Sequence, residues 1–149
     1  MKYKIPVSVL VVVYTPSLEV LLLERADKPG FWQSVTGSQE SGETLEATAI
    51  RELQEETGLD AGRYTLENWN MSNRFEIFRH WRGRYAPGTT HNTEHVFGLC
   101  VPERLPVTVS PREHLGYEWL DRDHAIDKVF SWTNAAALRE LPDRAPRQA

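Results

Sequence analysis

Residues Gly37–Leu59 read GSQESGETLEATAIRELQEETGL, and no other stretch says as much about the structure of this chain. The glycine-bearing loop that we expect over 37–42 leads into a helix from about Thr44 to Thr57. Thr44 can act as the N-cap, Glu46 lies in the positively polarised first turn, and Gly58 follows as a C′ stop. The pattern therefore predicts one helix with defined ends, entered directly from a loop.

Three glutamates of this helix share one stripe of its surface. At about 100° per residue, Glu55 and Glu56 lie roughly 60° to one side and roughly 40° to the other side of Glu52. An adjoining apolar arc is expected to bury the helix against a sheet, and its members are Leu45, Ala49, Ile50 and Leu53. Like charges at i and i+4 destabilise a helix, so we expect Arg51 and a bound divalent cation to compensate them.

The glutamates alone are also typical of a solvated surface helix, but the whole string is more specific. It resembles the Nudix box, in which fixed glycines, glutamates, an arginine and aliphatic residues recur at set intervals. The matching positions, without departure, are Gly37, Glu43, Arg51, Glu52, Leu53, Glu55, Glu56, Gly58 and Leu59. The resemblance implies an α+β Nudix fold, a mixed β-sheet sandwiched between α-helices.

The same resemblance implies a chemistry and a cofactor. Nudix enzymes hydrolyse a nucleoside diphosphate linked to another group, using Mg²⁺, for which Mn²⁺ could substitute. Glu52, Glu55 and Glu56 become metal ligands, and either Glu55 or Glu52 also acts as the general base. Arg51 would orient a carboxylate of the loop and helix, while Gly37 and Gly58 would permit bends.

Shorter runs outside the box extend the resemblance to about residue 138. They are YKIPVSVLVV, FWQSVTGS, FEIF, RYAPGTTHNTEH and EHLGYEWL, and they are similar to the bacterial dihydroneopterin triphosphate pyrophosphatase branch of the family. This implies hydrolysis of that pterin to its monophosphate and pyrophosphate, in folate synthesis, with dATP as a further substrate. Glu113 would be a fourth metal ligand. The implied substrate contacts are Lys4, Arg25, Thr36, Phe75, Glu76, Ile77, Phe78 and Ser131.

Several of these residues also have an ordinary structural interpretation. Glu113 taken alone is a solvated loop glutamate, and Lys4 and Arg25 are ordinary surface charges. The flat pterin ring should stack on aromatic side chains, for which the candidates are Trp32, Phe75, Phe78 and Trp132. The basic cluster of Arg79, His80, Arg82 and Arg84 either attracts the triphosphate or forms a solvated strand edge.

Two other functions compete with pterin hydrolysis. One is general hydrolysis of nucleoside triphosphates, including a sanitising role, and the other is a Nudix module that binds a nucleotide without cleaving it. Such modules usually lack part of the box, which is complete here. Nudix branches acting on ADP-ribose and on dinucleoside polyphosphates carry a downstream proline and tyrosine respectively. Residues 59–78 contain no proline and only Tyr64, close to the box, so both branches are disfavoured.

Composition limits the class of protein and its partners. The chain has 149 residues, 40% of them hydrophobic and 26% charged, which predicts a single domain over 1–149. A net charge of −4 disfavours a nucleic-acid polymer as partner and leaves a small pterin or nucleoside triphosphate. Cys100 is the only cysteine, so a reducing cytoplasm is the expected compartment. The apolar run over 6–14 is too short to span a membrane as a helix, and no signal indicates an oligomeric state.

Punctuation by Pro, Gly and Asn predicts the remaining elements. The expected strands cover 7–14, 19–24, 64–70, 74–81, 93–100, 107–109 and 117–120, with a short segment at 31–36 and an antiparallel pairing of the first two strands. A second helix is expected over Ser131–Glu140 with Ser131 as its cap, and Pro142–Ala149 is expected to be a flexible tail.

Overall fold

Seven strands form one sheet in the computed structural model, which describes residues 2–145. The strands are β1 (Val7–Tyr14), β2 (Glu19–Arg25), β3 (Trp32–Gln33), β4 (Val35–Ser38), β5 (Thr65–Glu76), β6 (His91–Cys100) and β7 (His114–Asp121). The helices are α1 (Leu45–Thr57), α2 (Arg122–Lys128) and α3 (Trp132–Arg144), with 3₁₀ turns at Ala61–Arg63 and Arg79–Arg84. The order across the sheet is β3-β2-β1-β6-β5, with β4 paired to β1 and β7 paired to β2.

The central strand β1 makes the sheet mixed. It runs parallel to β6 along its whole length and antiparallel to β2 and β4, which confirms the expected antiparallel start. Its core, Val9–Val13, is almost wholly inaccessible to solvent. A run of β-branched residues covered on both faces is typical of such a strand.

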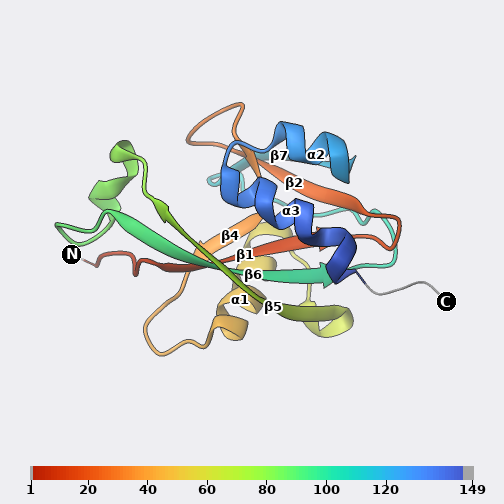
Figure 1. The fold of residues 1–149 in the computed structure, drawn as a ribbon, viewed down its shortest axis with the longest axis horizontal. Helices are drawn as coiled ribbons and strands as arrows, with labels where there is room; N and C mark the ends of the chain where they lie inside the picture. The colour runs from red at the N-terminus through yellow and green to blue at the C-terminus, as the bar shows by residue number, and fades with distance from the viewer. Residues whose placement is uncertain (1, 146–149) are drawn as a thin grey trace.

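Alternate residues of β1 face two separate cores, and helices cover both. Val9, Val11 and Val13 pack with Leu53 of α1, whereas Leu10 and Val12 pack with α3 and α2 residues. Figure 1 shows α1 on one side of the sheet and α2 and α3 on the other. The predicted α+β sandwich is therefore confirmed.

Helix α1 has the predicted ends but a different buried face. The Thr44 hydroxyl accepts from the Ala47 N–H at 3.0 Å, and Gly58 takes the left-handed conformation with φ 75°. Ile50, expected in the apolar arc, is 43% exposed, so that expectation is wrong. Relative to the expected orientation, the helix is rotated about its axis so that Thr48 is buried beside Ala49. The same rotation buries Glu52 and Glu56.

The middle of the chain departs from the expected strands. Residues 64–70 and 74–81 were expected as two strands, but β5 is one strand whose register shifts between Asn68 and Met71. The shift coincides with a left-handed Asn70, φ 53°. The chain then forms the 3₁₀ turn at Arg79–Arg84 instead of continuing the sheet. In the segment before α1, Gly37 belongs to strand β4 and not to the loop expected over 37–42.

Near the C-terminus two expectations are corrected, and the structure adds one helix that the sequence did not predict. No strand forms over 107–109, where the side chains instead pack on the α1 core. Helix α2 was not expected, because seven residues carry little periodicity; Asp121 caps it. Helix α3 continues through Pro142 to Arg144, since Leu141 is buried, and residues 146–149 of the expected tail lie outside the described residues. Within 2–145 no helix is long and apolar enough to span a membrane.

Candidate active site

A cavity of about 450 Å³ opens where β1, β4, β5 and β6 meet the first turn of α3. Its size suits a small ligand. The wall includes four expected substrate contacts from distant segments, Lys4, Arg25, Thr36 and Ser131. The segment Phe75–Phe78 and three of the four expected metal ligands, Glu52, Glu56 and Glu113, also line it. The structure therefore brings most of the predicted site residues to one place.

Two carboxyl groups of α1 form the first wall of this cavity and are buried. Glu56 is 3% exposed, and its Oε1 has no hydrogen-bond partner among residues 2–145. Burial raises the pKa of Glu56 well above its usual value, and its contact with Glu52 adds to the increase. Burial also raises the pKa of Glu52. Both groups therefore lie where negative charge is poorly solvated.

Gly37 explains how Glu52 fits beneath β4. A Cβ at this position would lie 2.0 Å from the Glu52 carboxyl carbon, so any other residue here would displace that carboxyl group. The backbone of Gly37 is in an ordinary extended strand, and thus its expected role in a bend is wrong. Its function is to let the carboxyl group approach the strand closely.

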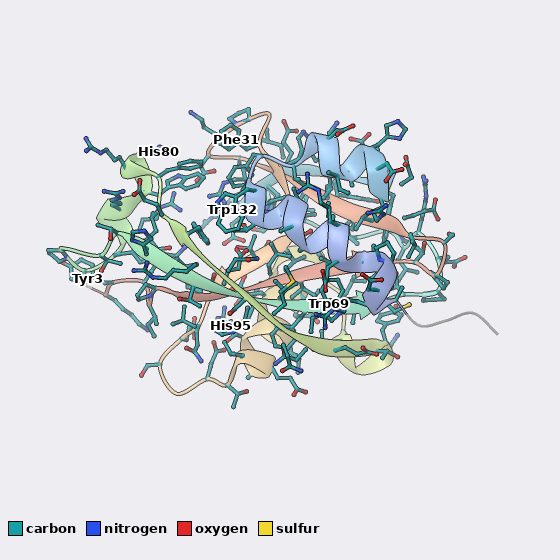
Figure 2. The ribbon with its side chains drawn as sticks, in the orientation of Figure 1. Tyr3, Phe31, Trp69, His80, His95 and Trp132 are labelled. Atoms are coloured by element: carbon teal, nitrogen blue, oxygen red, sulfur yellow. The ribbon has the colours of Figure 1, made fainter. Side chains whose placement is uncertain are left out.

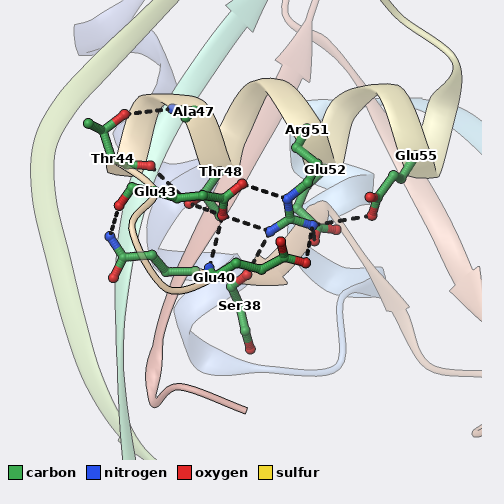
Figure 3. Close-up of polar contacts among 10 residues, drawn as sticks. Ser38, Glu40, Glu43, Thr44, Ala47, Thr48, Arg51, Glu52 and Glu55 are labelled. Carbon is green, nitrogen blue, oxygen red and sulfur yellow. Dashed lines mark hydrogen bonds and ion pairs between the residues drawn. The ribbon is translucent and has the colours of Figure 1, made fainter. Parts of the chain in front are cut away.

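Arg51 connects the loop before α1 to the helix, as Figure 3 shows. Its guanidinium donates two bonds to Glu43, at 2.7 and 3.0 Å, one to Glu52 at 2.7 Å and one to the Ser38 carbonyl at 3.0 Å. The bonds from Arg51 lower the pKa of Glu43 to about 2. A bidentate arginine holds its partners in a fixed geometry, so the orientation of Glu52 depends on this network.

Glu55 is more exposed than the other two helix carboxylates. Its side chain is 52% exposed and contacts Arg51 at 3.3 Å, on the outer side of the helix. The three glutamates share a stripe, and Arg51 contacts both Glu52 and Glu55, but only Glu52 and Glu56 line the cavity. Within the described part of the chain, no group of three His, Cys, Asp or Glu side chains is arranged to hold a metal ion.

The remaining donors nevertheless fit a hard divalent cation. The unpartnered Glu56 Oε1 and the buried carboxyl of Glu52 lie together without enough positive charge to neutralise both. Glu113 faces the same cavity and acts electrostatically on Glu56. Carboxylate oxygens are the ligands that Mg²⁺ and Mn²⁺ take, and a buried carboxylate without a partner is unfavourable.

His114 is a neighbour of this group that the sequence did not indicate. It is buried, and its Nε2 lies 3.6 Å from Glu56 Oε1. Burial, with a contribution from Arg25, lowers the pKa of His114 to about 4. The imidazole is therefore neutral near pH 7 and does not supply the missing positive charge.

Cations form a second wall of the cavity. Asp27, which the sequence did not indicate, accepts bonds from Arg25 at 2.7 and 2.8 Å and from Arg84 at 3.0 Å. These bonds hold the pKa of Asp27 well below its usual value. Lys4 is nearby; burial, followed by repulsion from Arg84, lowers its pKa. Three cations facing one carboxylate leave a surface suited to an anion.

Only part of the expected basic cluster belongs to that wall. Arg84 lines the cavity, whereas Arg82 donates to the Ile77 carbonyl at 2.9 Å and pairs with Glu76 at 3.3 Å. Arg79 is exposed and His80 stacks on Phe78. The segment is thus a folded turn that presents one arginine to the cavity.

Aromatic rings form the third wall, and two were missed. Phe130 stacks on Phe31 with centroids 4.8 Å apart, and Trp81 lies 6.1 Å from Phe130 with the guanidinium of Arg25 at 4.4 Å. Of the four expected stacking candidates, Phe75, Phe78 and Trp132 line the cavity. Trp32 instead packs beneath Lys128, outside it. Figure 2 shows Phe31 and Trp132 in the upper middle of the view with His80 to their left, whereas Trp69 lies lower and to the right.

Comparison with known proteins gives consistent matches. The family model described as NUDIX domain matches residues 4–141. A dihydroneopterin triphosphate diphosphatase of Escherichia coli is 47% identical over 93% of each chain, and one of Haemophilus influenzae is 47% identical over 94% of this chain and 89% of its own. The solved structure of the E. coli dihydroneopterin triphosphate pyrophosphohydrolase superposes with a TM-score of 0.89 over 95% of this chain and 97% of its own, at 46% identity.

Proposed function

Because this chain belongs to the Nudix family, we propose that it hydrolyses dihydroneopterin triphosphate to dihydroneopterin monophosphate and pyrophosphate. The near-full-length identity to two bacterial enzymes named for that substrate supports the proposal. The observation that carries it is the cavity itself, in which buried carboxyls, cations and aromatic rings face one space. A triphosphate and a flat ring need these three surfaces.

We assign the metal-binding role to Glu52, Glu55, Glu56 and Glu113. When bound, Mg²⁺ supplies charge neutralisation at the phosphates and a lower pKa for a coordinated water, and Mn²⁺ could replace it. Glu52 is buried with its carboxyl fixed by Arg51, whereas Glu55 is held outside by the same arginine. Either Glu55 or Glu52 serves as the general base, and Arg51, which donates to both carboxylates, holds them in position.

The cationic wall is suited to the phosphate end of the substrate. Lys4, Arg25 and Arg84 lie around the cavity, and the Asp27 bonds fix the two guanidinium groups relative to each other. The hydroxyl of Thr36 is available on β4 to donate to a phosphate oxygen. These groups bind the anion and hold it in one orientation, which lowers the entropic part of the barrier.

The aromatic wall is suited to the other end. Phe78, Trp81 and Phe130 lie within 6.2 Å of one another, measured between ring centroids, and offer apolar faces to a bicyclic ring. Their rings also exclude water from one side of the cavity. The ligand is a small molecule, and with one cysteine in the chain we place the enzyme in the cytoplasm.

The decisive assay measures pyrophosphate release from dihydroneopterin triphosphate, dATP and 8-oxo-dGTP in excess Mg²⁺. We expect the highest kcat/KM with the pterin, and monophosphate and pyrophosphate in equal amounts. A higher kcat/KM with either nucleotide would overturn the substrate assignment and favour a general nucleoside triphosphate hydrolase. Release of single phosphates would contradict the reaction itself.

A further inference from the structure

A row of polar side chains crosses the sheet at the floor of the cavity. Glu94 on β6 lies in register with Ser8 on β1 and with Asn73 on β5, so the three project from the same face. Asn92, two residues before Glu94, donates to the Ser8 hydroxyl at 2.7 Å. Ser8, Asn92 and Glu94 all line the cavity. The sheet therefore presents buried polar groups where an apolar floor would be expected.

Glu94 is the unusual member of this row. It is 4% exposed, and its Oε1 accepts no hydrogen bond from any group in residues 2–145. The Asn92 Oδ1 beside it also has no partner there. Among residues 2–145 no cation acts on Glu94. Burial raises its pKa to about 7, and a hydrogen bond with Thr133 acts in the opposite direction. A buried carboxyl oxygen without a partner is destabilising, so its presence needs a reason in function.

The carboxyl of Glu94 favours a ligand whose ring edge carries two adjacent hydrogen-bond donors. A carboxylate has two oxygens that accept a pair of parallel N–H bonds. An amino-oxo-pyrimidine ring, as in a pterin or guanine, presents such a pair from its ring N–H and exocyclic amino group. Adenine presents one donor and one acceptor instead, which a carboxylate matches at only one position.

We infer that Glu94 is a specificity-determining residue that binds the ring N–H and amino group of the substrate heterocycle. This rests on the proposed function in naming the ring as a pterin, but the chemistry holds for any ring with that edge. The ring lies with its edge on the sheet floor and its face toward the aromatic wall. Glu94 thus contributes to ring choice, separately from the carboxylates of α1 at the phosphate end.

A structural role for Glu94 makes a different prediction. Asn73, directly across on β5, has a buried Nδ2 without a partner within the described residues. If the two side chains simply bond to each other, replacing Glu94 would change stability without changing which ring is preferred.

The test is Glu94→Gln, which exchanges one acceptor for a donor with almost no change in shape. kcat/KM is measured for dihydroneopterin triphosphate, dGTP and dATP, and calorimetry measures binding of dihydroneopterin monophosphate, dGMP and dAMP. We expect kcat/KM for the pterin and for dGTP to fall by about 10- to 100-fold relative to kcat/KM for dATP. The affinities for dihydroneopterin monophosphate and dGMP should likewise fall relative to the affinity for dAMP. The matched control is Glu67→Gln, the same change at an exposed position of β5.

The outcomes separate this inference from the proposed function. A parent protein that prefers nucleotides refutes pterin hydrolysis, yet the dGTP to dATP ratio still tests Glu94. Equal losses for all three substrates, or unchanged ratios in both turnover and binding, would overturn the inference. A matching change in Glu67→Gln would also overturn it, because the effect would then be general.

Discussion

Buried carboxyls occur in two regions of this molecule, and their surroundings differ. On α1, Glu52 accepts a 2.7 Å bond from Arg51, which is itself fixed by Glu43 and Ser38. On β6, Glu94 has a hydrogen bond with Thr133 but, in the part of the chain that the structure describes, no cation beside it. The Glu52 carboxyl is therefore positioned by the protein before any ligand binds. In Glu94, by contrast, one carboxyl oxygen, Oε1, has no hydrogen-bond partner within residues 2–145. We interpret the first region as serving the reaction and the second as serving ring choice.

The largest expected effect comes from Glu56→Gln on α1. Removal of this carboxylate should lower kcat by roughly 10³-fold, about 4 kcal/mol, because an anionic metal ligand is lost. The thermal midpoint should not fall, since burial already makes the charged form of Glu56 unfavourable. Steady-state kinetics and calorimetric unfolding measure the two quantities. Glu46→Gln, on the exposed first turn of the same helix, is the control and should retain activity.

Glu94→Gln should produce the next largest effect, on stability. The folded pKa is about 7 and the ordinary value 4.5, so the native state holds a proton that the unfolded state releases between these pH values. Stability of the parent therefore falls as pH rises through this window. The variant lacks this loss. Its free energy of unfolding should exceed that of the parent by on the order of 3 kcal/mol above pH 7 and should differ little below pH 4.5. Urea unfolding at pH 4.5, 6 and 8 measures the difference; a constant difference would contradict the burial argument.

Arg51→Lys tests the network of the first region. Lysine keeps the charge but cannot bond Glu43 and Glu52 at the same time, so we expect about 2 kcal/mol lower stability and a 10- to 100-fold lower kcat. Arg63→Lys, at an exposed arginine in the following 3₁₀ turn, is the control. A normal kcat in Arg51→Lys would show that the orientation of Glu52 does not matter.

Thr133→Val should have the smallest effect and act on the second region. Its hydroxyl bond lowers the pKa of Glu94, so removing it should raise that pKa further. Turnover of the pterin should fall by less than about fivefold, because only one hydrogen bond is lost and the Glu94 carboxyl itself is kept. Carbon NMR titration of the glutamates measures the pKa, with Thr89→Val, in the loop before β6, as control. A lowered pKa would contradict the assigned contact.

The two regions also differ in how well sequence could predict them. Helix α1, its Thr44 and Gly58 ends and its carboxylates lie within one contiguous stretch, so local rules were sufficient. What these rules left open was the rotation of the helix about its axis, which is set by packing. That rotation buries Thr48, exposes Ile50 and leaves Glu55 half exposed while Glu52 and Glu56 are buried.

Glu94 could not be found in this way, because its surroundings come from segments far apart in the chain. Ser8 and Asn92 are brought to it by strand register, and Thr133 by the packing of α3. Trp81 and Phe130 were missed for the same reason. The α2 helix was missed because seven residues after a strand show almost no period.

The most direct test of whether the two regions have separate functions is the ratio of kcat/KM for dihydroneopterin triphosphate to kcat/KM for dATP. It is measured in the parent, Glu56→Gln and Glu94→Gln. Glu56→Gln should lower both rates and leave the ratio within about threefold of the parent, while Glu94→Gln should lower the ratio by 10-fold or more with the dATP rate retained. A changed ratio in Glu56→Gln, together with an unchanged ratio in Glu94→Gln, would contradict the assignment of reaction and ring choice to separate carboxyls.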